Sequence, residues 1–153
     1  MARFTLSRDI KFFEGISREL VDVVIETAVV LYKLVIEDSK TNLYGESLNK
    51  TYYQGVQTTA MIEREPSASE YEGFGSDKSQ NVEFRFNRFT LEDTGFYPEV
   101  GDIIFHNEAY FEIDNVTEDF LIGGRAGEEE RFSLICSTFM TRRSSIQTEM
   151  RIV

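Results

Sequence analysis

The sequence predicts an α+β fold that is mainly β, either a small β-barrel or a sandwich, with one N-terminal helix and long inter-strand loops. Three observations carry this prediction. A helix-like apolar period occurs near the N-terminus, several short segments then alternate apolar and polar residues, and no regular exchange of strands with helices follows. At 153 residues, 41% of them hydrophobic, the chain can bury a core of its own. We therefore expect a single domain over residues 1–153.

The helix is expected at about residues 17–31. Polar residues recur there every four positions, at Arg18, Asp22 and Glu26. The residues between them form a wide apolar face: Leu20, Val21, Val24, Ile25, Ala28 and Leu31. That period favours a helix, although the many β-branched residues of this segment also fit a strand. A strand is expected directly afterwards, at residues 32–37.

Two strands are expected in the middle of the chain. Residues 55–63 place four side chains on one face, namely Val56, Thr58, Ala60 and Ile62. Residues 81–90 alternate in the same way, with a register shift near Phe89 that a β-bulge would produce. Between these strands, residues 64–80 show neither period, and so long a connection is usually functional or disordered. A turn-rich loop is expected earlier, at residues 38–50.

A β-hairpin is expected over residues 97–116. Phe111 and Ile113 alternate with Glu112 and Asp114 on its second strand, and two residues, Asn107 and Glu108, can close the turn. Residues 121–124 end a short further strand. Residues 132–141 form another, with apolar side chains on both faces, as in a strand covered on both sides. The tail, residues 142–153, is either an extended arm or a strand added to a neighbouring subunit.

The composition excludes several classes of function. A formal net charge of −11 argues against ordinary nucleic-acid binding, because phosphate contacts are made chiefly by clustered Lys and Arg. One cysteine, Cys136, and one histidine, His106, cannot supply a conventional zinc site or an internal disulfide. The apolar residues near the N-terminus are interrupted by charges, so we expect no membrane span.

His106 and Glu108 form an H-x-E pair, which belongs to the signature of zinc deaminases. The P-C-x-x-C that completes that signature is absent, so we interpret His106 as a histidine beside a hairpin turn. Glu112 and Asp114 share a strand face and could hold a hard cation, but any half-exposed strand gives the same alternation. Cys136, within an apolar strand, is interpreted as a core residue. We therefore expect no catalytic residue, metal ligand or cofactor site.

Acidic residues are concentrated in one part of the chain, at Glu108, Glu112, Asp114, Glu118 and Asp119. Such a cluster could meet a basic patch on another protein, or line a passage through which DNA moves without binding. A solvated face explains it equally well. The alternatives stay open at this point.

Three segments occur in a recognisable order: ELVDVVIETA at residues 19–28, NLYGES at residues 42–47 and PEVGDIIFHNEAYFEIDNV at residues 98–116. Together with ERFSLICSTF at residues 130–139, they resemble the neck proteins of contractile-tailed bacteriophages, which are head-completion or head–tail connector proteins. The resemblance covers roughly residues 17–140.

The resemblance implies a structural virion protein without enzymatic activity. It implies a ring of identical subunits, usually six in related necks, that closes the DNA-filled head and receives the tail. The ring would lie between a portal-side adaptor ring and a tail-terminator ring, with genomic DNA passing non-specifically through its lumen. The expected location is the virion neck, and the host cytoplasm during assembly.

Within that expectation, the long loop at residues 64–80 is the first candidate for an element that enters the lumen or docks on a neighbouring ring. Its central residues are Glu70, Tyr71, Glu72, Gly73, Phe74 and Gly75. The loop at residues 38–50 is the second candidate. Two functions of other classes remain as alternatives. One is a small metal-dependent hydrolase that uses His106, Glu108, Glu112 and Asp114, and the other is a module that binds a peptide along a strand edge.

Overall fold

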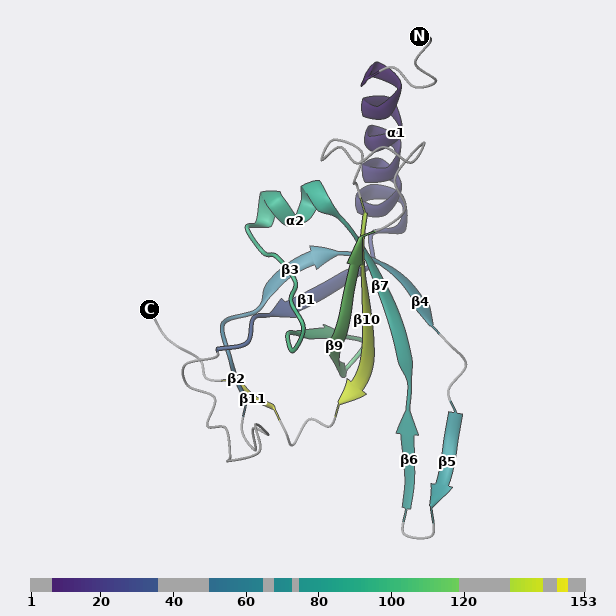
Figure 1. Ribbon diagram of the computed structural model, residues 1–153, viewed down its shortest axis with the longest axis vertical. Coiled ribbons are helices and arrows are strands. Elements are labelled where there is room, and N and C mark those ends of the chain that lie inside the picture. The colour runs from purple at the N-terminus through teal and green to yellow at the C-terminus, as the bar shows by residue number, and fades with distance from the viewer. Residues whose placement is uncertain are drawn as a thin grey trace.

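The computed structural model describes residues 7–35, 50–64, 68–72, 75–118, 133–141 and 146–148, with the backbone alone for 68–72, 75–79 and 146–148. A helix stands at one end of a curled antiparallel sheet, and a two-stranded ribbon extends from the opposite end (Figure 1). This architecture confirms the predicted α+β class with a mainly β body. It contains one principal sheet and not the two layers of a sandwich.

The N-terminal helix begins earlier than the sequence predicts. Helix α1 spans Ser7–Glu19 and continues as a single π-helical segment, η1, over Leu20–Ile25. Glu26, in the left-handed region with φ 45°, ends it. The expected helix at residues 17–31 is therefore wrong in its second half, where β1 spans Ala28–Tyr32. The β-branched residues of that half belong to the sheet, in which alternate side chains of β1 are buried.

The principal sheet has seven strands in the order β3-β1-β8-β9-β10-β7-β4, and all neighbouring pairs are antiparallel. Besides β1 it contains β3 (Val56–Thr59), β4 (Met61–Arg64), β7 (Asn81–Asn87), β8 (Ile103–His106), β9 (Ala109–Glu118) and β10 (Ser133–Thr141). Its two edge strands, β3 and β4, are consecutive in the chain and are separated by Ala60 alone. The two edges of the sheet consequently meet at Ala60, and the sheet curls around its apolar side.

Two small pairs of strands complete the described structure. β5 (Ala68–Glu72) and β6 (Gly75–Ser79) form an antiparallel hairpin that extends the ribbon of β4 and β7 (Figure 1). The prediction of a loop without secondary structure at residues 64–80 was therefore wrong. β2 (Lys50–Tyr52) pairs in parallel with β11 (Ile146–Thr148), so this part of the tail adds a strand to its own chain. The strand expected at residues 121–124 lies outside the described residues.

A second helix, α2 (Arg88–Thr94), replaces the end of the strand that was expected to reach residue 90. The side chain of Asn87 accepts a hydrogen bond from the backbone N–H of Phe89 at 3.0 Å, which caps the first turn. Gly95 ends the helix in the left-handed region with φ 68°. What looked like a bulge near Phe89 is thus a change from strand to helix.

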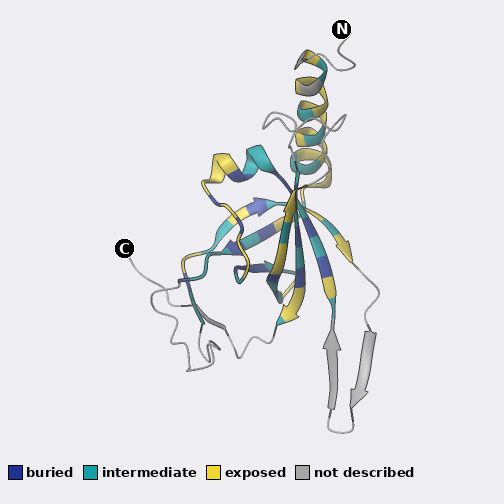
Figure 2. Ribbon diagram, viewed as in Figure 1, coloured by how far each residue is buried: buried dark blue, intermediate teal, exposed yellow. Residues whose placement is uncertain are grey.

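The core lies inside the curl of the sheet, where buried residues appear dark blue in Figure 2. Phe84 of β7 is fully buried, and its ring lies 6.5 Å from that of Phe86 and 5.5 Å from that of Phe111. Leu91 of α2 closes the same cluster. The predicted shared faces are confirmed: Thr58, Ala60, Val82, Phe84 and Phe86 are buried, and Val56 and Ile62 are partly buried against them. The single strand expected at residues 55–63 is divided at Ala60 into β3 and β4.

Candidate functional site: the projecting helix and the acidic strand

The helix is attached to the body through polar side chains. Asp22 accepts a hydrogen bond from Thr59 of β3 at 2.6 Å and another from Thr90 of α2 at 2.7 Å. Arg18, one turn earlier, lies 3.5 Å from Asp22 and 2.5 Å from Asp93 of α2. The base of the helix is therefore held to two elements of the body by its charged side.

The apolar side of the same helix faces solvent. Seven large apolar side chains on it are between 37% and 70% exposed, and we call them the helix stripe: Phe12, Phe13, Ile16, Leu20, Val23, Val24 and Ile25. The helix accordingly appears mostly exposed in Figure 2. Apolar residues on a surface helix normally face the core. Here the usual orientation is reversed.

The π-helical segment helps to keep the helix stripe on one side. Phe12, Ile16, Leu20 and Val24 are spaced by four residues, and in an α-helix each such step rotates the side chain by ~40° about the axis. In η1 the Glu26 N–H donates to the carbonyl oxygen of Val21, five residues earlier, which widens the turn. The wider turn offsets the accumulated rotation, so Val24 remains near the line of Ile16 and Leu20.

A groove adjoins the helix stripe where the helix meets the sheet. Its volume is about 200 Å³, and its apolar lining comes from Leu20 and Val21 of η1, Met61 of β4 and Phe86 of β7. Polar residues complete the lining, namely Ser17, Arg85, Asn87 and Ser133. Met61 is 40% exposed. We call this hollow the base groove. The apolar surface of the protein thus continues from the helix stripe onto the edge of the sheet.

A buried carboxylate fixes the chain before β8. Asp102 is 1% exposed and accepts hydrogen bonds from the backbone N–H groups of Leu34 at 2.9 Å and Glu99 at 2.8 Å. Its partner is the Lys33 ammonium at 3.0 Å, which also contacts Glu99 at 2.6 Å. Burial alone would lower the pKa of Lys33, but the hydrogen bonds to Glu99 and Asp102 outweigh burial and raise it. We interpret this cluster as structural, since its members form hydrogen bonds and ion pairs with one another.

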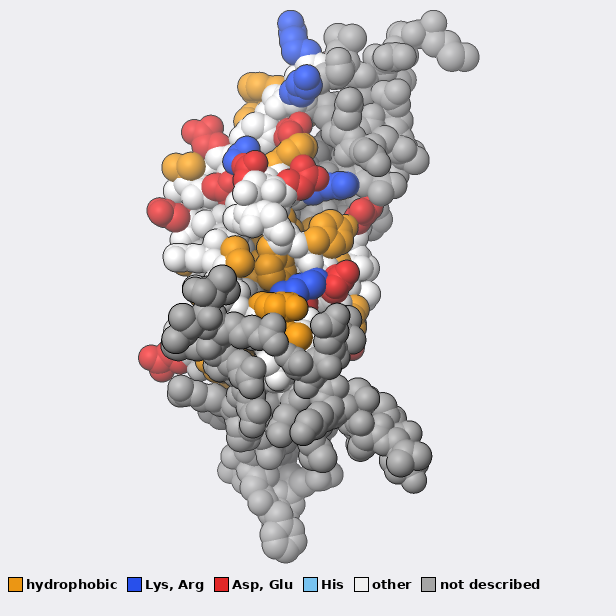
Figure 3. Space-filling view, turned by 90° about the vertical axis from the view of Figure 1, so that its left-hand side faces the viewer, with side chains coloured by type: hydrophobic (Ala, Val, Ile, Leu, Met, Phe, Trp, Pro, Cys, Tyr) orange, Lys and Arg blue, Asp and Glu red, His pale blue; other side chains and the backbone are white. Residues whose placement is uncertain are grey.

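Charged side chains are mixed over the visible surface. On the face drawn in Figure 3, the coloured side chains show acidic, basic and apolar groups side by side, without a continuous basic area. Neither the net charge of −11 nor the side chains coloured on this face indicates a phosphate-binding surface. Within the described residues, no helix is long and apolar enough to span a membrane.

The acidic strand β9 is divided by a β-bulge. The pairing with β10 shifts between Ser137 and Thr138, which face Asn115 and Ile113 respectively, so Asp114 has no directly opposite residue. Glu112 lies opposite exposed Phe139, whereas Glu118 lies opposite buried Leu134. Directly opposite side chains share a face, so Glu112 and Glu118 lie on different faces of the sheet.

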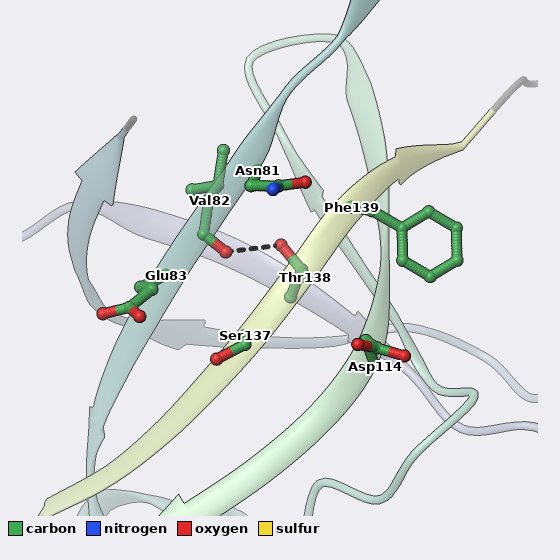
Figure 4. A pocket seen from close by; sticks show the side chains of 7 residues that line it. All are labelled: Asn81, Val82, Glu83, Asp114, Ser137, Thr138 and Phe139. Carbon is green, nitrogen blue, oxygen red and sulfur yellow. Dashed lines mark hydrogen bonds between the residues drawn. The ribbon is translucent and has the colours of Figure 1, made fainter. Parts of the chain in front are cut away.

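Each predicted acidic residue therefore has its own surroundings. Glu112 forms an ion pair with Lys50. Asp114 lines a shallow hollow of about 180 Å³ beside Asn81, Glu83 and Ser137, where the Thr138 hydroxyl donates to the Val82 carbonyl oxygen at 2.8 Å (Figure 4). Glu118 lines a different hollow, and Asp119 lies outside the described residues. Among the described carboxylates, Glu112 and Glu118 do not share a face, and the role of the acidic residues toward a partner or a lumen stays a prediction.

The hairpin of β8 and β9 closes as the sequence predicts, with Asn107 at φ 49° and Glu108 at φ 64° in a two-residue turn. The His106 ring packs edge-on against Phe84, with 6.3 Å between centroids, and its Nδ1 lies 3.4 Å from the Ala28 carbonyl oxygen. Among the described residues, no three His, Cys, Asp or Glu side chains are close enough together to hold a metal ion. The packing of His106 is that of a structural residue beside a turn.

Cys136 is fully buried, as expected of a core residue. Burial raises the pKa of its thiol to about 12, and the negative charge of Asp102 adds to the effect. A thiol held protonated in this way is a poor nucleophile. Its surroundings are those of a small apolar side chain.

The candidate docking loop is placed only in part. Glu70, Tyr71 and Glu72 lie in β5 and Gly75 begins β6, while Gly73 and Phe74 lie outside the described residues. The pairing of Glu72 with Gly75 puts these residues at the tip of the ribbon. Residues 38–49, the second candidate, also lie outside the described part of the chain.

Sequence reasoning missed the helix stripe and the Lys33–Asp102 cluster. The predicted apolar face shares only Leu20, Val24 and Ile25 with the stripe, and the period alone does not reveal whether such a face is buried or exposed. The cluster joins residues 69 positions apart in the chain, and no local pattern signals a pairing of that kind.

Comparison with known proteins gives similarity to solved structures alone. No protein-family model matches the chain, and neither does any curated protein. Among solved structures, a chain of "Virion of native gene transfer agent (GTA) particle" is similar over 74% of this chain and 93% of its own length, with 14% sequence identity and a TM-score of 0.45. A similarity at this level establishes neither a family nor a function for the present protein.

Proposed function

We infer that the protein is a structural component of a phage-like virion. Its proposed place is the neck, in a ring that closes the DNA-filled head and joins it to the tail. Its proposed partners are further copies of itself, an adaptor ring on the portal side and a tail-terminator ring. The proposal starts from the sequence resemblance at residues 19–28, 42–47, 98–116 and 130–139.

One structural observation carries the proposal furthest: the helix is held by its polar side and exposes its apolar side. Contiguous apolar patches of that kind mark interaction surfaces, because a soluble monomer gains nothing from leaving them in water. The ribbon of β5 and β6 projects from the other end of the body (Figure 1). A subunit with projections at both ends is suited to contacts with two neighbours in an assembly.

The charge of the chain agrees with a passage for DNA. A surface with net charge −11 repels phosphate, so DNA can pass such a surface without adhering to it. The hydrolase alternative gains no support from the described residues, since His106 is packed on Phe84 and Glu112 is paired with Lys50.

The experiment that tests the proposal removes the gene from the virus or particle that encodes it. DNA-filled heads and separate, complete tails should then accumulate, because both are built independently of the neck. Electron microscopy of the lysate and a nuclease-protection assay of packaged DNA give the two readouts. Normal, tailed particles without this protein would contradict a neck role.

A second variant tests the ribbon as the element that retains DNA. Deletion of residues 67–76 removes β5 and the first two residues of β6, neither of which is a strand of the seven-stranded sheet. We expect tails still to attach while packaged DNA becomes accessible to nuclease. Heads that stay sealed would show that the ribbon does not retain the genome, and would leave the neck role itself intact.

A further inference from the structure

We propose that the helix stripe of one subunit packs into the base groove of the next copy of the same chain, in a head-to-tail contact. The inference rests on the proposed ring and names the surfaces that would build it. It assigns a role to two features that the fold of a single chain leaves unused.

The exposed area is large enough for such a contact. The seven side chains of the helix stripe leave on the order of 600 Å² of apolar surface in water, given ~150–250 Å² for a whole aromatic side chain. The largest apolar patch of a typical monomer is about 300–600 Å². A standard interface takes ~800 Å² from each partner, so the helix stripe with its polar margins supplies one side of an interface.

The geometry of a ring requires two different surfaces that fit each other. A two-fold pair uses one patch twice and closes after two subunits, whereas a ring needs a heterologous contact. The chain offers both parts: a convex apolar ridge on the helix and a concave apolar groove beside Met61 and Phe86. Leu20 borders both, so successive helices would lie side by side around the ring.

Electrostatics also favour an apolar contact between copies. Two chains of charge −11 repel each other, and the repulsion is least where the touching surfaces carry few unpaired charges. The charged residue that lines the base groove, Arg85, is paired with Glu63 and Glu83 of its own chain. The helix keeps its anchoring charges, Arg18 and Asp22, on the side that faces its own body. The helix is fixed at its base before assembly, so the contact requires no refolding and its entropic cost is small.

The experiment uses one charged substitution on each surface. Ile16→Arg blocks the helix stripe, Met61→Arg blocks the base groove, and both side chains are already 40% exposed or more, so the fold is expected to persist. Phe139→Arg is the matched control, because Phe139 is also 40% exposed but lies on β10 away from the groove. Circular dichroism and thermal unfolding check that each variant is folded.

Sedimentation velocity and native mass spectrometry give the readout. The unmodified protein and the Phe139→Arg control should associate into one closed species as concentration rises. Each blocked variant should associate at least ~100-fold more weakly, because a charge would be buried unpaired. An equal mixture of the two blocked variants should form a one-to-one dimer and nothing larger, since one intact stripe meets one intact groove.

Three outcomes would overturn the proposal. Association of Ile16→Arg at the unmodified affinity would exclude the helix stripe. Loss of association in Ile16→Arg but not in Met61→Arg would show that helices pair with each other. An unmodified protein that stays monomeric up to roughly millimolar concentration would show that the helix stripe meets a different protein. In each case the gene-removal experiment still decides the neck role by itself.

Discussion

The sheet and the helix place their apolar residues in opposite ways. In the sheet, Phe84, Phe86 and Phe111 point inward and are at most 2% exposed. In the helix, Arg18 and Asp22 point toward the body, while Phe12 at 65% and Val24 at 70% exposure point away from it. The sheet therefore packs its apolar residues within the chain, whereas the helix leaves its apolar residues exposed to solvent. The proposed contact between subunits would use the second region and leave the first unchanged.

The largest effect on stability is expected in the core of the sheet. Phe84→Ala removes a fully buried ring that contacts Phe86 and Phe111, and should lower the free energy of unfolding by about 3–5 kcal/mol. Urea unfolding followed by circular dichroism measures the loss. A change below about 1 kcal/mol would mean that the sheet is not the main source of stability.

A smaller but still large effect is expected at the buried carboxylate. Asp102→Asn keeps the shape of the side chain but removes the charge that pairs with Lys33. The free energy of unfolding should fall by about 2–4 kcal/mol, because the buried backbone N–H donors then face an amide group. The matched control is Glu99→Gln, whose side chain is 64% exposed and contacts the same ammonium. Glu99→Gln should lower the free energy of unfolding by less than about 1 kcal/mol. Equal losses in the two variants would contradict the structural role of Asp102.

Alkaline conditions should weaken the sheet through Cys136. The pKa of its thiol is raised in the folded state from 9.0 to about 12, so the unfolded chain loses this proton first as the pH rises. The contribution of this thiol to the free energy of unfolding is complete below pH 9. It declines between pH 9 and 12, by on the order of 1 kcal/mol per pH unit. In Cys136→Ala the decline should begin nearer pH 10, where Tyr52, whose pKa burial also raises, starts to contribute. Urea unfolding at each pH measures this decline. If it began at the same pH in Cys136→Ala as in the unmodified protein, Cys136 would not be its cause.

The smallest effect on stability is expected on the helix. Phe12→Ser removes an apolar side chain that contacts mainly solvent, so the free energy of unfolding should change by no more than about 0.5 kcal/mol. The same substitution should weaken the association of subunits, as sedimentation velocity would show. A loss of stability comparable to that of Phe84→Ala would remove the distinction between the two regions.

The sheet was largely predictable from the sequence because alternation directly reports which side of a strand is buried. The inward faces of residues 55–63 and 81–87 and the turn at Asn107 and Glu108 follow from that rule. The bulge at Asp114 was not predictable, because it depends on the register of β10, which comes from another part of the chain. The placement of Glu112 and Glu118 on different faces of the sheet was not predictable for the same reason.

The helices were harder to place. Ala28 and Leu31 extend the apolar face of the predicted helix, yet both lie in β1, where Leu31 is fully buried. The preference of the β-branched residues Val29 and Val30 for a strand outweighs the helical period there. α2 carried readable signals, an Asn before its first turn and a Gly after its last, but the aromatic alternation that precedes it concealed them. For the candidate site, the sequence indicated that an apolar face existed but not its orientation.

Ala60 connects the strand that holds the helix with the strand that leads toward the ribbon. It is fully buried between β3 and β4, and its backbone N–H donates to the Thr27 carbonyl oxygen at 3.0 Å. Thr59, directly before it, donates its hydroxyl hydrogen to Asp22 of the helix, and Met61, directly after it, begins β4. The anchor of the helix and the strand that leads to the opposite end of the molecule are therefore separated by one buried residue.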